Sequence, residues 1–289
     1  MCSIGKLAEL ACLWEATIPK PGNVHPDASF VDMSYADFIA SAAAIRPVFD
    51  RAQSEPLGTT IEDAIRATQE HVGKNTNLGI VLLLAPLAKL EKINVETATD
   101  RTELQQSIAK TLQKTTVDDA KRTYSAIRLA QPGGLGDAPS EDVKRQPNST
   151  LLEAMSLATE RDRIARQYAE AFRDVIETGL VCFSSAWRSY GDLAVAVQKC
   201  FLEFLAIFSD SLILRKCGAA IANEASRRAN KILHHGWPQS TRSIDEWKKL
   251  DAWLREDGHT RNPGTSADLT AAVLFLALRG GIIPATIRL

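Results

Sequence analysis

Apolar side chains recur along this chain at the three- and four-residue spacing that is typical of helices packed on a core. In the opening segment, Leu7, Leu10 and Trp14 fall on one face of such a helix. Lys6 and Glu9 interrupt the apolar positions, which argues against a signal peptide. The first residues are therefore predicted to form an amphipathic helix of the mature fold.

Helix-start signals precede most of the periodic runs. Each consists of a hydroxyl side chain followed three residues later by a carboxylate, a pair that satisfies free amides of a first helical turn. The pairs are Ser34 with Asp37, Thr60 with Asp63, Thr116 with Asp119, Thr150 with Glu153 and Ser243 with Glu246. Each pair is expected to open a helix.

Two longer runs support the same fold class. Residues 78–88, LGIVLLLAPLA, predict a buried helix, and they fall short of the roughly 20 residues that cross a bilayer. Residues 151–178 keep one apolar face, including Tyr168 and Phe172, and are expected to form an amphipathic helical run. No alternating run or Asn-Gly turn predicts strands, so the sequence indicates an all-α, multi-helical fold.

Three polar loops separate the predicted helices and are candidates for function. They span Ile18–Met33, Pro132–Ser149 and Gly258–Ser266. The second is longer than the two to eight residues that usually connect helices, and long ordered loops are often functional. Because helical patterning is similar on both sides of it, residues 1–289 are predicted to form a single domain.

Composition excludes some partners. The 34 basic and 35 acidic residues give a net charge of −1, so neither a nucleic-acid surface nor a polybasic membrane anchor is expected. The five cysteines form no CxxC pair and are typical of reduced thiols, which predicts a cytoplasmic protein. Any anionic ligand must therefore be held by local basic groups.

Phosphate binding is indicated by three Gly-containing segments beside helices. They are GKNTNLG (Gly73–Gly79), PGGLG from Pro132, and NPGTSAD (Asn262–Asp268). Helix N-termini and turns of successive amides bind anions, and lysines at positions 20 and 74 strengthen this interpretation. The alternative is that each glycine only ends a helix and that Ser266 is an N-cap. No Walker A or Rossmann motif occurs.

Acidic residues near the loops suit a magnesium site, because Mg²⁺ prefers one or two carboxylates with phosphates and water. Asp119 is also explained by its capping position. Asp210 lies among apolar residues, so its charge requires a partner such as Arg215 or Lys216, or a ligand. The acids in or beside loops are Asp27, Asp32, Asp118, Asp119, Asp137, Asp210 and Asp268.

Four ordered motifs resemble a known family. PKPGNVH, GKNTNLGI, SDSLILRKCG and NPGTSADLTAAVLFLAL, between Glu15 and Leu278, resemble the ATP:dephospho-CoA triphosphoribosyltransferase family. These enzymes make the precursor of the prosthetic group of citrate lyase and malonate decarboxylase. The resemblance implies an all-α enzyme that takes ATP as a substrate together with Mg²⁺.

The implied reaction moves the triphosphoribosyl group of ATP to a 2′-hydroxyl of dephospho-CoA and releases adenine. It needs a proton source, a base, stabilisation of an oxocarbenium-like charge and cations for the triphosphate. By motif position the expected catalytic residues are Asp27, Asp32 and Asp210, and the expected metal ligands are Asp137 and Asp268. The expected substrate-binding residues are Lys20, Gly22, His25, Lys74, Asn75, Thr76, Asn77, Gly79, Lys216, Asn262, Gly264 and Ser266.

The motifs also depart from the family pattern. Where the synthases typically read PKPGLVD and VNTHKG, this chain has Asn23, His25 and Asn77. An alternative is therefore the same donor chemistry with another acceptor in a different cofactor pathway, and a further one is a non-catalytic ATP-binding helical protein. Small-molecule substrates and a homodimer are the expected partners.

Overall fold

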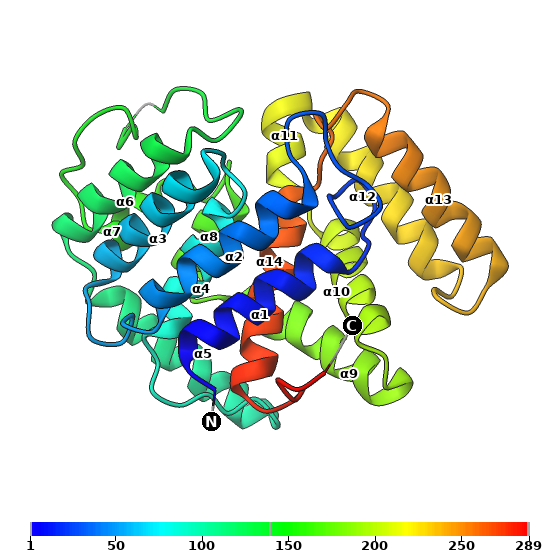
Figure 1. The fold of residues 1–289 in the computed structure, drawn as a ribbon, viewed down its shortest axis with the longest axis horizontal. Coiled ribbons are helices and arrows are strands. Elements are labelled where there is room, and N and C mark those ends of the chain that lie inside the picture. The colour runs from blue at the N-terminus through cyan, green and yellow to red at the C-terminus, as the bar shows by residue number, and fades with distance from the viewer. Residues whose placement is uncertain (1, 139, 288–289) are drawn as a thin grey trace.

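The computed structural model describes residues 2–138 and 140–287, and helices account for all the regular structure in these ranges (Figure 1). The only β-type pairing there is an isolated bridge between His25 and Ala28. The predicted all-α fold is confirmed. The elements are α1 (Ile4–Thr17), α2 (Tyr35–Phe49), α3 (Leu57–Val72), α4 (Leu78–Ala88), α5 (Ala98–Gln113), α6 (Val117–Ala130), α7 (Leu151–Ser156), α8 (Arg163–Ala169), the π-helix η1 (Asp174–Leu180), α9 (Val181–Tyr190), α10 (Leu193–Ile207), α11 (Ser211–Cys217), α12 (Ala219–His234), α13 (Thr241–Arg255) and α14 (Gly264–Arg279).

Helix α14 is the central element of the fold. Its sequence is apolar on nearly every side, and all its residues are buried except Gly264, Asp268 and Arg279, which are half-buried. Helices α1, α4 and α10 and the π-helix η1 pack against it. In Figure 1, α14 passes behind α1, with α3, α4, α6 and α7 to one side and α10 to α13 to the other. The N-terminus of α14 therefore lies where the two groups of helices meet.

Two hydrophobic clusters form the core. The larger joins α1 to α9 with η1, and the smaller joins α10 to α13. Helix α10 contributes Cys200 to the larger cluster and Phe201 to the smaller. Helix α14 likewise contributes Leu269 to the larger and Ala267 to the smaller. The single domain at residues 1–289 stays a prediction, which these shared helices favour.

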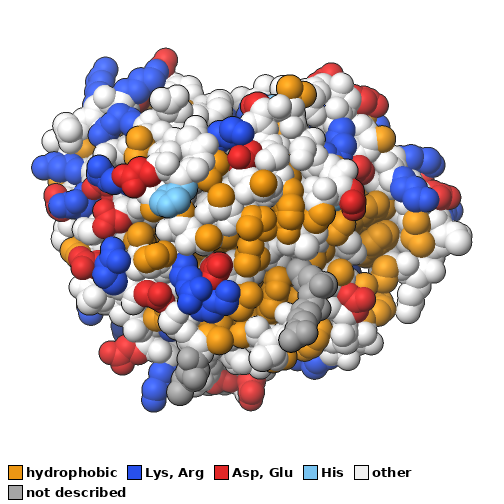
Figure 2. Space-filling model, viewed as in Figure 1, with side chains coloured by type: hydrophobic (Ala, Val, Ile, Leu, Met, Phe, Trp, Pro, Cys, Tyr) orange, Lys and Arg blue, Asp and Glu red, His pale blue; other side chains and the backbone are white. Residues whose placement is uncertain are grey.

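Helix α1 confirms the predicted N-terminal helix. Ala11 and Trp14 are buried on it, and Leu7, Leu10 and Leu13 are partly buried against the larger cluster. Figure 2 shows hydrophobic side chains gathered in the middle of the face that carries α1, with charged side chains mainly around the rim.

Three of the five predicted helix starts are confirmed. Ser34, Thr116 and Thr150 each form a capping box at the first turn of α2, α6 and α7. Asp119 in the second of these also accepts a hydrogen bond from the amide of Gly58 at 2.7 Å. This carboxylate therefore ties the start of α3 to the start of α6.

Two predicted helix starts are wrong because the helix begins three or four residues earlier. The hydroxyl of Thr60 donates to the Pro56 carbonyl, and that of Ser243 donates to the Ser240 carbonyl. Both side chains thus lie inside α3 and α13, where they bond to the preceding turn. The capping box at Thr97, which opens α5, was not predicted.

The helical run predicted for residues 151–178 is broken into α7, α8 and η1. The carboxylate of Asp162 accepts hydrogen bonds from Ile164 and the next amide, which starts α8 anew. Ala171 and Phe172 then adopt positive φ angles of 48° and 62°, which no α-helix contains. The apolar periodicity survives because the side chains of Tyr168 and Phe172 are still buried.

The helices and the cysteines of the structure can be compared with what the composition predicted. Across the described residues, each helix is too short or too polar to cross a bilayer. All five cysteines are free thiols, and Cys12 and Cys200 are buried. Cys2 is exposed, so not all five thiols are buried, and their reduced state stays a prediction.

The double role of Asp119 gives a stability prediction. Replacing Asp119 by Ala removes the acceptor of the Thr116 amide in the capping box of α6 and leaves the buried Gly58 amide unpaired. Together these losses should lower the free energy of unfolding by about 2 kcal/mol. The neighbouring Asp118→Ala is the matched control, because the Asp118 side chain is 68% exposed and pairs only at the surface. Urea denaturation measures both, and equal losses would contradict this role of Asp119.

Candidate active site

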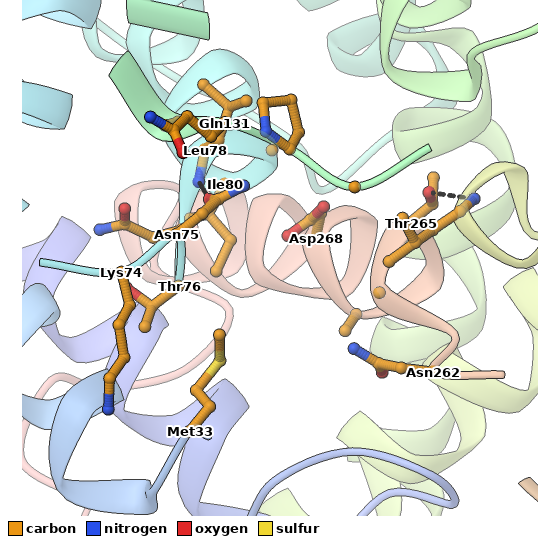
Figure 3. A pocket seen from close by; sticks show the side chains of 18 of the residues that line it. Met33, Lys74, Asn75, Thr76, Leu78, Ile80, Gln131, Asn262, Thr265 and Asp268 are labelled. Atoms are coloured by element: carbon orange, nitrogen blue, oxygen red, sulfur yellow. Dashed lines mark hydrogen bonds between the residues drawn. The ribbon is translucent and has the colours of Figure 1, made fainter. Parts of the chain in front are cut away.

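A pocket of about 640 Å³ opens at the N-terminus of α14. Its walls come from the opening loop, the segment leading into α4, the end of α6 with the loop that follows, helix α11 and the first turns of α14 (Figure 3). Each of the four motifs quoted above contributes to the lining. Segments far apart in the sequence therefore form one site.

The structure brings together ten of the seventeen predicted site residues. Those that line the pocket are Asp32, Lys74, Asn75, Thr76, Asn77, Gly79, Lys216, Asn262, Gly264 and Asp268. Those outside the lining are Lys20, Gly22, His25, Asp27, Asp137, Asp210 and Ser266. Of the departures from the family pattern, Asn23 and Asn77 line the pocket and His25 does not.

Lys20 forms an ion pair with Glu15, a residue that lines the pocket, and does not line the pocket itself. Its side chain has no exposed area, and its ammonium lies 2.9 Å from the carboxylate of Glu15. It also donates to the backbone carbonyls of Glu15 and, at 3.0 Å, Ile18. A lysine with these partners cannot reach a phosphate in this structure, which corrects the predicted contact. Glu15 itself is buried and lines the pocket.

Gly22, the glycine of the opening loop, allows this loop to pack closely against α13. Gly22 has φ +73°, and a Cβ atom there would lie 2.8 Å from the Leu254 Cβ. Its amide donates to Asp251 at 2.7 Å, and Arg255 donates to the Asn23 carbonyl at 2.6 Å. Helix α13 thus holds this turn so that Asn23 lies at the pocket, and the predicted ligand contact of Gly22 is not seen.

The end of the opening loop lies outside the pocket. The amide of Asp27 donates to the His25 ring at 3.3 Å, and the backbones of His25 and Ala28 pair with each other. Burial lowers the pKa of His25, and the charge of Arg255 lowers it further. Asp27 is exposed. Neither side chain lies where it can act on a ligand in the pocket.

Asp210 joins two helix starts. It is 2% exposed and accepts hydrogen bonds from the amides of Leu212 and Ile213, which cap α11. Its other oxygen accepts from the amide and the hydroxyl of Ser266, both at 2.8 Å. The predicted partners Arg215 and Lys216 are not used. Burial raises the pKa of Asp210, while these hydrogen bonds lower it. Asp210 and Ser266 are therefore structural in this geometry.

Asp137 does not form the predicted metal site. Its side chain is 85% exposed and pairs with Lys144 at the surface. In the part of the chain that the structure describes, no three His, Cys, Asp or Glu side chains are grouped so that they could hold a metal ion. A cation held by protein ligands alone is therefore not supported.

Asp268 is the carboxyl group at the middle of the pocket wall. Figure 3 shows it on α14 between Thr265 and the residues that lead into α4. No hydrogen bond or ion pair to it is formed within residues 2–138 and 140–287. Gly79 packs directly against it, since a Cβ atom there would lie 2.0 Å from its Oδ2. Glycine is required at position 79 so that this carboxyl fits.

The surroundings of Asp268 favour its protonated form. Burial raises the pKa of this carboxyl well above its usual range, and the negative charges of Glu15, Asp210 and Asp162 raise it further. Arg215 acts in the opposite direction. A protonated carboxyl in a pocket is a potential proton donor.

One wall of the pocket is cationic. Arg215 pairs with Asp162 at 2.6 Å, and its Nε is buried without a hydrogen-bond partner among the described residues. The loop after α6 lies against this wall: a Cβ atom at Gly133 would be 2.9 Å from the Lys216 side chain. At Gly134, with φ +71°, it would be 3.2 Å from Arg215. The positive φ at Gly134 favours glycine where the loop passes close to Arg215.

The opposite wall is the segment leading into α4. Lys74 pairs with Asp37 at 2.9 Å, and hydrogen bonds from Ser34 and then from Lys74 hold the pKa of Asp37 below its usual range. Asn75 accepts from the first amide of α4. Asn77 donates to another side chain, but its Oδ1 is buried without a partner in the described structure. Further amides of this first turn lack helical acceptors.

Several lining residues were not predicted. Glu15 was not proposed as a site residue because it lies near the end of the predicted first helix. Asp162 was not proposed because it lies within the run that was predicted to be helical. Arg215 was considered only as a partner of Asp210. Among those missed, the polar and aromatic ones are Glu15, Asn23, Phe30, Phe38, Gln69, Gln131, Asp162, Arg215, His259 and Thr265.

Comparisons with known proteins identify the family of this chain. The family model described as ATP:dephospho-CoA triphosphoribosyl transferase (CitG) matches residues 1–284. A crystal structure from Archaeoglobus fulgidus, described as a "putative triphosphoribosyl-dephospho-coA synthase", is similar with a TM-score of 0.65 and 26% identity. The similarity covers 84% of this chain and 99% of that chain. No curated protein matches this sequence.

The buried ion pair gives a second prediction. Lys20→Met should lower the free energy of unfolding by about 3–5 kcal/mol, because it leaves the Glu15 charge buried and uncompensated. The double variant with Glu15→Gln removes both charges and should lose less than the sum of the single variants. Chemical denaturation of the four proteins measures this coupling, and additive losses would show that the two side chains act independently.

The third prediction concerns pH. The folded-state pKa of Asp268 is raised above its unfolded value, so the folded protein keeps this proton to higher pH than the unfolded chain does. The associated stabilisation is complete below the usual Asp pKa of about 4 and is lost as pH rises through the raised value. Asp268→Asn has no carboxyl group to ionise, so its stability does not fall in this way. Urea denaturation at pH values from 4 upward should therefore show the free energy of unfolding of the wild type falling relative to that of the variant. Parallel pH curves for the two proteins would contradict the raised pKa.

Proposed function

Because this chain belongs to the ATP:dephospho-CoA triphosphoribosyl transferase family, we propose that the pocket at the N-terminus of α14 is its active site. The chain is a transferase that moves the triphosphoribosyl group of ATP to dephospho-CoA. The observation that carries the site assignment is that all four motifs line one pocket around Asp268, a carboxyl group without a protein partner among the described residues.

The chemistry sets three requirements. The bond between C1′ of the ATP ribose and adenine breaks, and a bond forms between C1′ and a hydroxyl oxygen of the acceptor. Adenine needs a proton as it leaves, the ribose passes through an oxocarbenium-like state, and the hydroxyl must lose its proton. Two carboxyl groups with different protonation can meet these needs.

We assign the proton donor to Asp268. Burial and neighbouring negative charges favour its protonated form, and that form can give its proton to a nitrogen of the departing adenine. We assign Glu15 the opposite role. Its charge is balanced by Lys20 from the protein side, which leaves a carboxylate in the lining to stabilise the positive ribose and accept the hydroxyl proton.

We assign the triphosphate to the cationic wall. Arg215 and Lys216 line the pocket next to each other at the end of α11. Gly133 of the loop after α6 also lines the pocket next to Lys216, and the amides of glycine-containing turns bind phosphate oxygens. Lys74 on the opposite wall is then available to the diphosphate of dephospho-CoA.

The expected Mg²⁺ fits this pocket only as an ion that is held mainly by phosphate oxygens and water. Such an ion needs one or two carboxylates, and Asp162 is the carboxylate beside Arg215 on the cationic wall. Bound there, it would neutralise charge on the triphosphate. The metal-ligand role predicted for Asp268 would compete with its role as a proton donor, since a coordinated carboxylate is ionised.

The remaining expectations stay predictions. The near balance of 34 basic and 35 acidic residues argues against a nucleic-acid partner, and a cytoplasmic location and a homodimer are expected. Light scattering at several protein concentrations measures the oligomeric state directly.

The function predicts a measurable product. The protein incubated with ATP, Mg²⁺ and dephospho-CoA should release adenine, and it should release none when dephospho-CoA is omitted. Asp268→Asn should slow this release by about a hundredfold or more, because the variant cannot donate the proton. The control is Asp137→Asn, an exposed acid outside the pocket, which should keep its rate within about twofold, the range expected of a surface change. A normal rate in Asp268→Asn would refute the assignment of the acid.

A further inference from the structure

A second cavity, the α9–α10 groove, lies between η1, α9 and α10. Its volume is about 530 Å³, and its lining shares no residue with that of the pocket at α14. Two of the exposed large hydrophobic side chains of the described chain line it, Val181 at 39% and Ile207 at 54% exposure. Exposed apolar side chains that gather in one place are typical of interaction surfaces.

Helix α9 forms one wall of this groove from small side chains. Cys182, Ser185, Ala186 and Ser189 line it, and their spacing of three and four residues places them on one face of α9. Side chains this short leave room for those of another helix that lies along the groove.

Helix α10 forms the other wall with a row of residues four apart. Lys199, Glu203 and Ile207 line the groove, and Val195 continues the row towards the start of the helix. None of these four is buried, although eight other residues of α10 are. Rows of residues four apart are the ridges through which helices most often pack against one another. The row is therefore a packing face of α10 that the other described helices leave open.

The two charged residues of this row form no salt bridge among the residues that the structure describes. The Lys199 ammonium lies 5.8 Å from the centre of the Tyr190 ring, which favours its place at the groove. The Cys182 thiol is in range of both charges, since burial and then Glu203 raise its pKa to about 12 while Lys199 lowers it. The third charged residue of the lining, Glu177, is exposed on η1.

The row is complementary to itself. From Val195 to Ile207 its order is apolar, basic, acidic and apolar. When a second copy of the row runs in the opposite direction, basic meets acidic and apolar meets apolar at every position. Homodimers with a two-fold axis use the same patch on both copies, so they require this kind of pattern. An unrelated partner requires no such symmetry, and the pattern therefore favours a second copy of this chain.

We propose that the α9–α10 groove is the interface of a homodimer, in which α10 packs antiparallel against α10 of a second copy. Lys199 pairs with Glu203 of the partner subunit, and Ile207 contacts Val195 of the partner subunit, each twice by symmetry. A stable interface takes roughly 800 Å² from each copy, so the small-residue wall of α9 is covered as well. The proposal gives the expected homodimer its surface and does not rest on the proposed reaction.

Reversal of the two charges in the full-length protein tests this interface. Sedimentation equilibrium over a series of protein concentrations should show the wild type as a dimer. Lys199→Glu and Glu203→Lys should each raise the dimer Kd by about a hundredfold or more, because the two-fold axis then opposes like charges twice. The double variant restores opposite charges and should return the Kd to within about tenfold of the wild type.

Matched controls separate the interface from general effects. Lys110→Glu makes the same change of charge at an exposed position of α5 and should leave the Kd within about twofold. Ile207→Asp should raise the Kd by about tenfold or more, because it removes an apolar contact at the interface. Leu157→Asp should leave it unchanged, since Leu157 is 60% exposed outside the groove. Circular dichroism should show the wild-type helical signal in every variant.

Three results would overturn the proposal. One is a wild type that stays monomeric at every concentration. Another is a dimer that neither single charge reversal weakens, because it is then built through a different surface. The third is a double variant that dissociates as readily as the single ones, which contradicts the pairing of the two charges. Adenine release is a separate measurement, so failure of the proposed function leaves these results unchanged.

Discussion

The carboxylate of Asp210 fixes the geometry on which the pocket depends. One of its oxygens caps α11 and the other holds the first turn of α14 through Ser266. Helix α11 carries the cationic wall and α14 carries Asp268, so one buried group sets the relation between the phosphate-binding cations and the assigned acid. A charged residue in an apolar setting is stabilised here by four hydrogen bonds and not by a counter-ion.

The Lys20–Glu15 pair follows the same principle on the other side of the site. In both places a strongly polar residue of a family motif lies behind the pocket and holds a neighbour that lines it. Such supporting groups orient catalytic side chains before any ligand arrives, which reduces the reorganisation that a reaction requires. The motifs therefore combine contact residues with residues that position them.

The helices could be predicted from the sequence because their causes are local. Apolar spacing indicated α1 and α4, and the hydroxyl–carboxylate pairs at Ser34, Thr116 and Thr150 marked real first turns. Tertiary contacts decided the rest. Lys20 in a proline-rich loop looks like a phosphate ligand, and only the packed structure shows that its ammonium is enclosed with Glu15. Arg215, Asp162 and Phe30 have no short-range signal that separates them from ordinary surface residues.

The two hydrophobic clusters meet at the pocket, and this has a consequence for how the protein loses function. Helix α4 and the opening of the site rest on the larger cluster, while α11 and the contacts of α13 with the opening loop rest on the smaller. Loosening of the smaller cluster would therefore remove the cationic wall and the anchor of the opening loop from the site, even while α4 stays on the larger cluster.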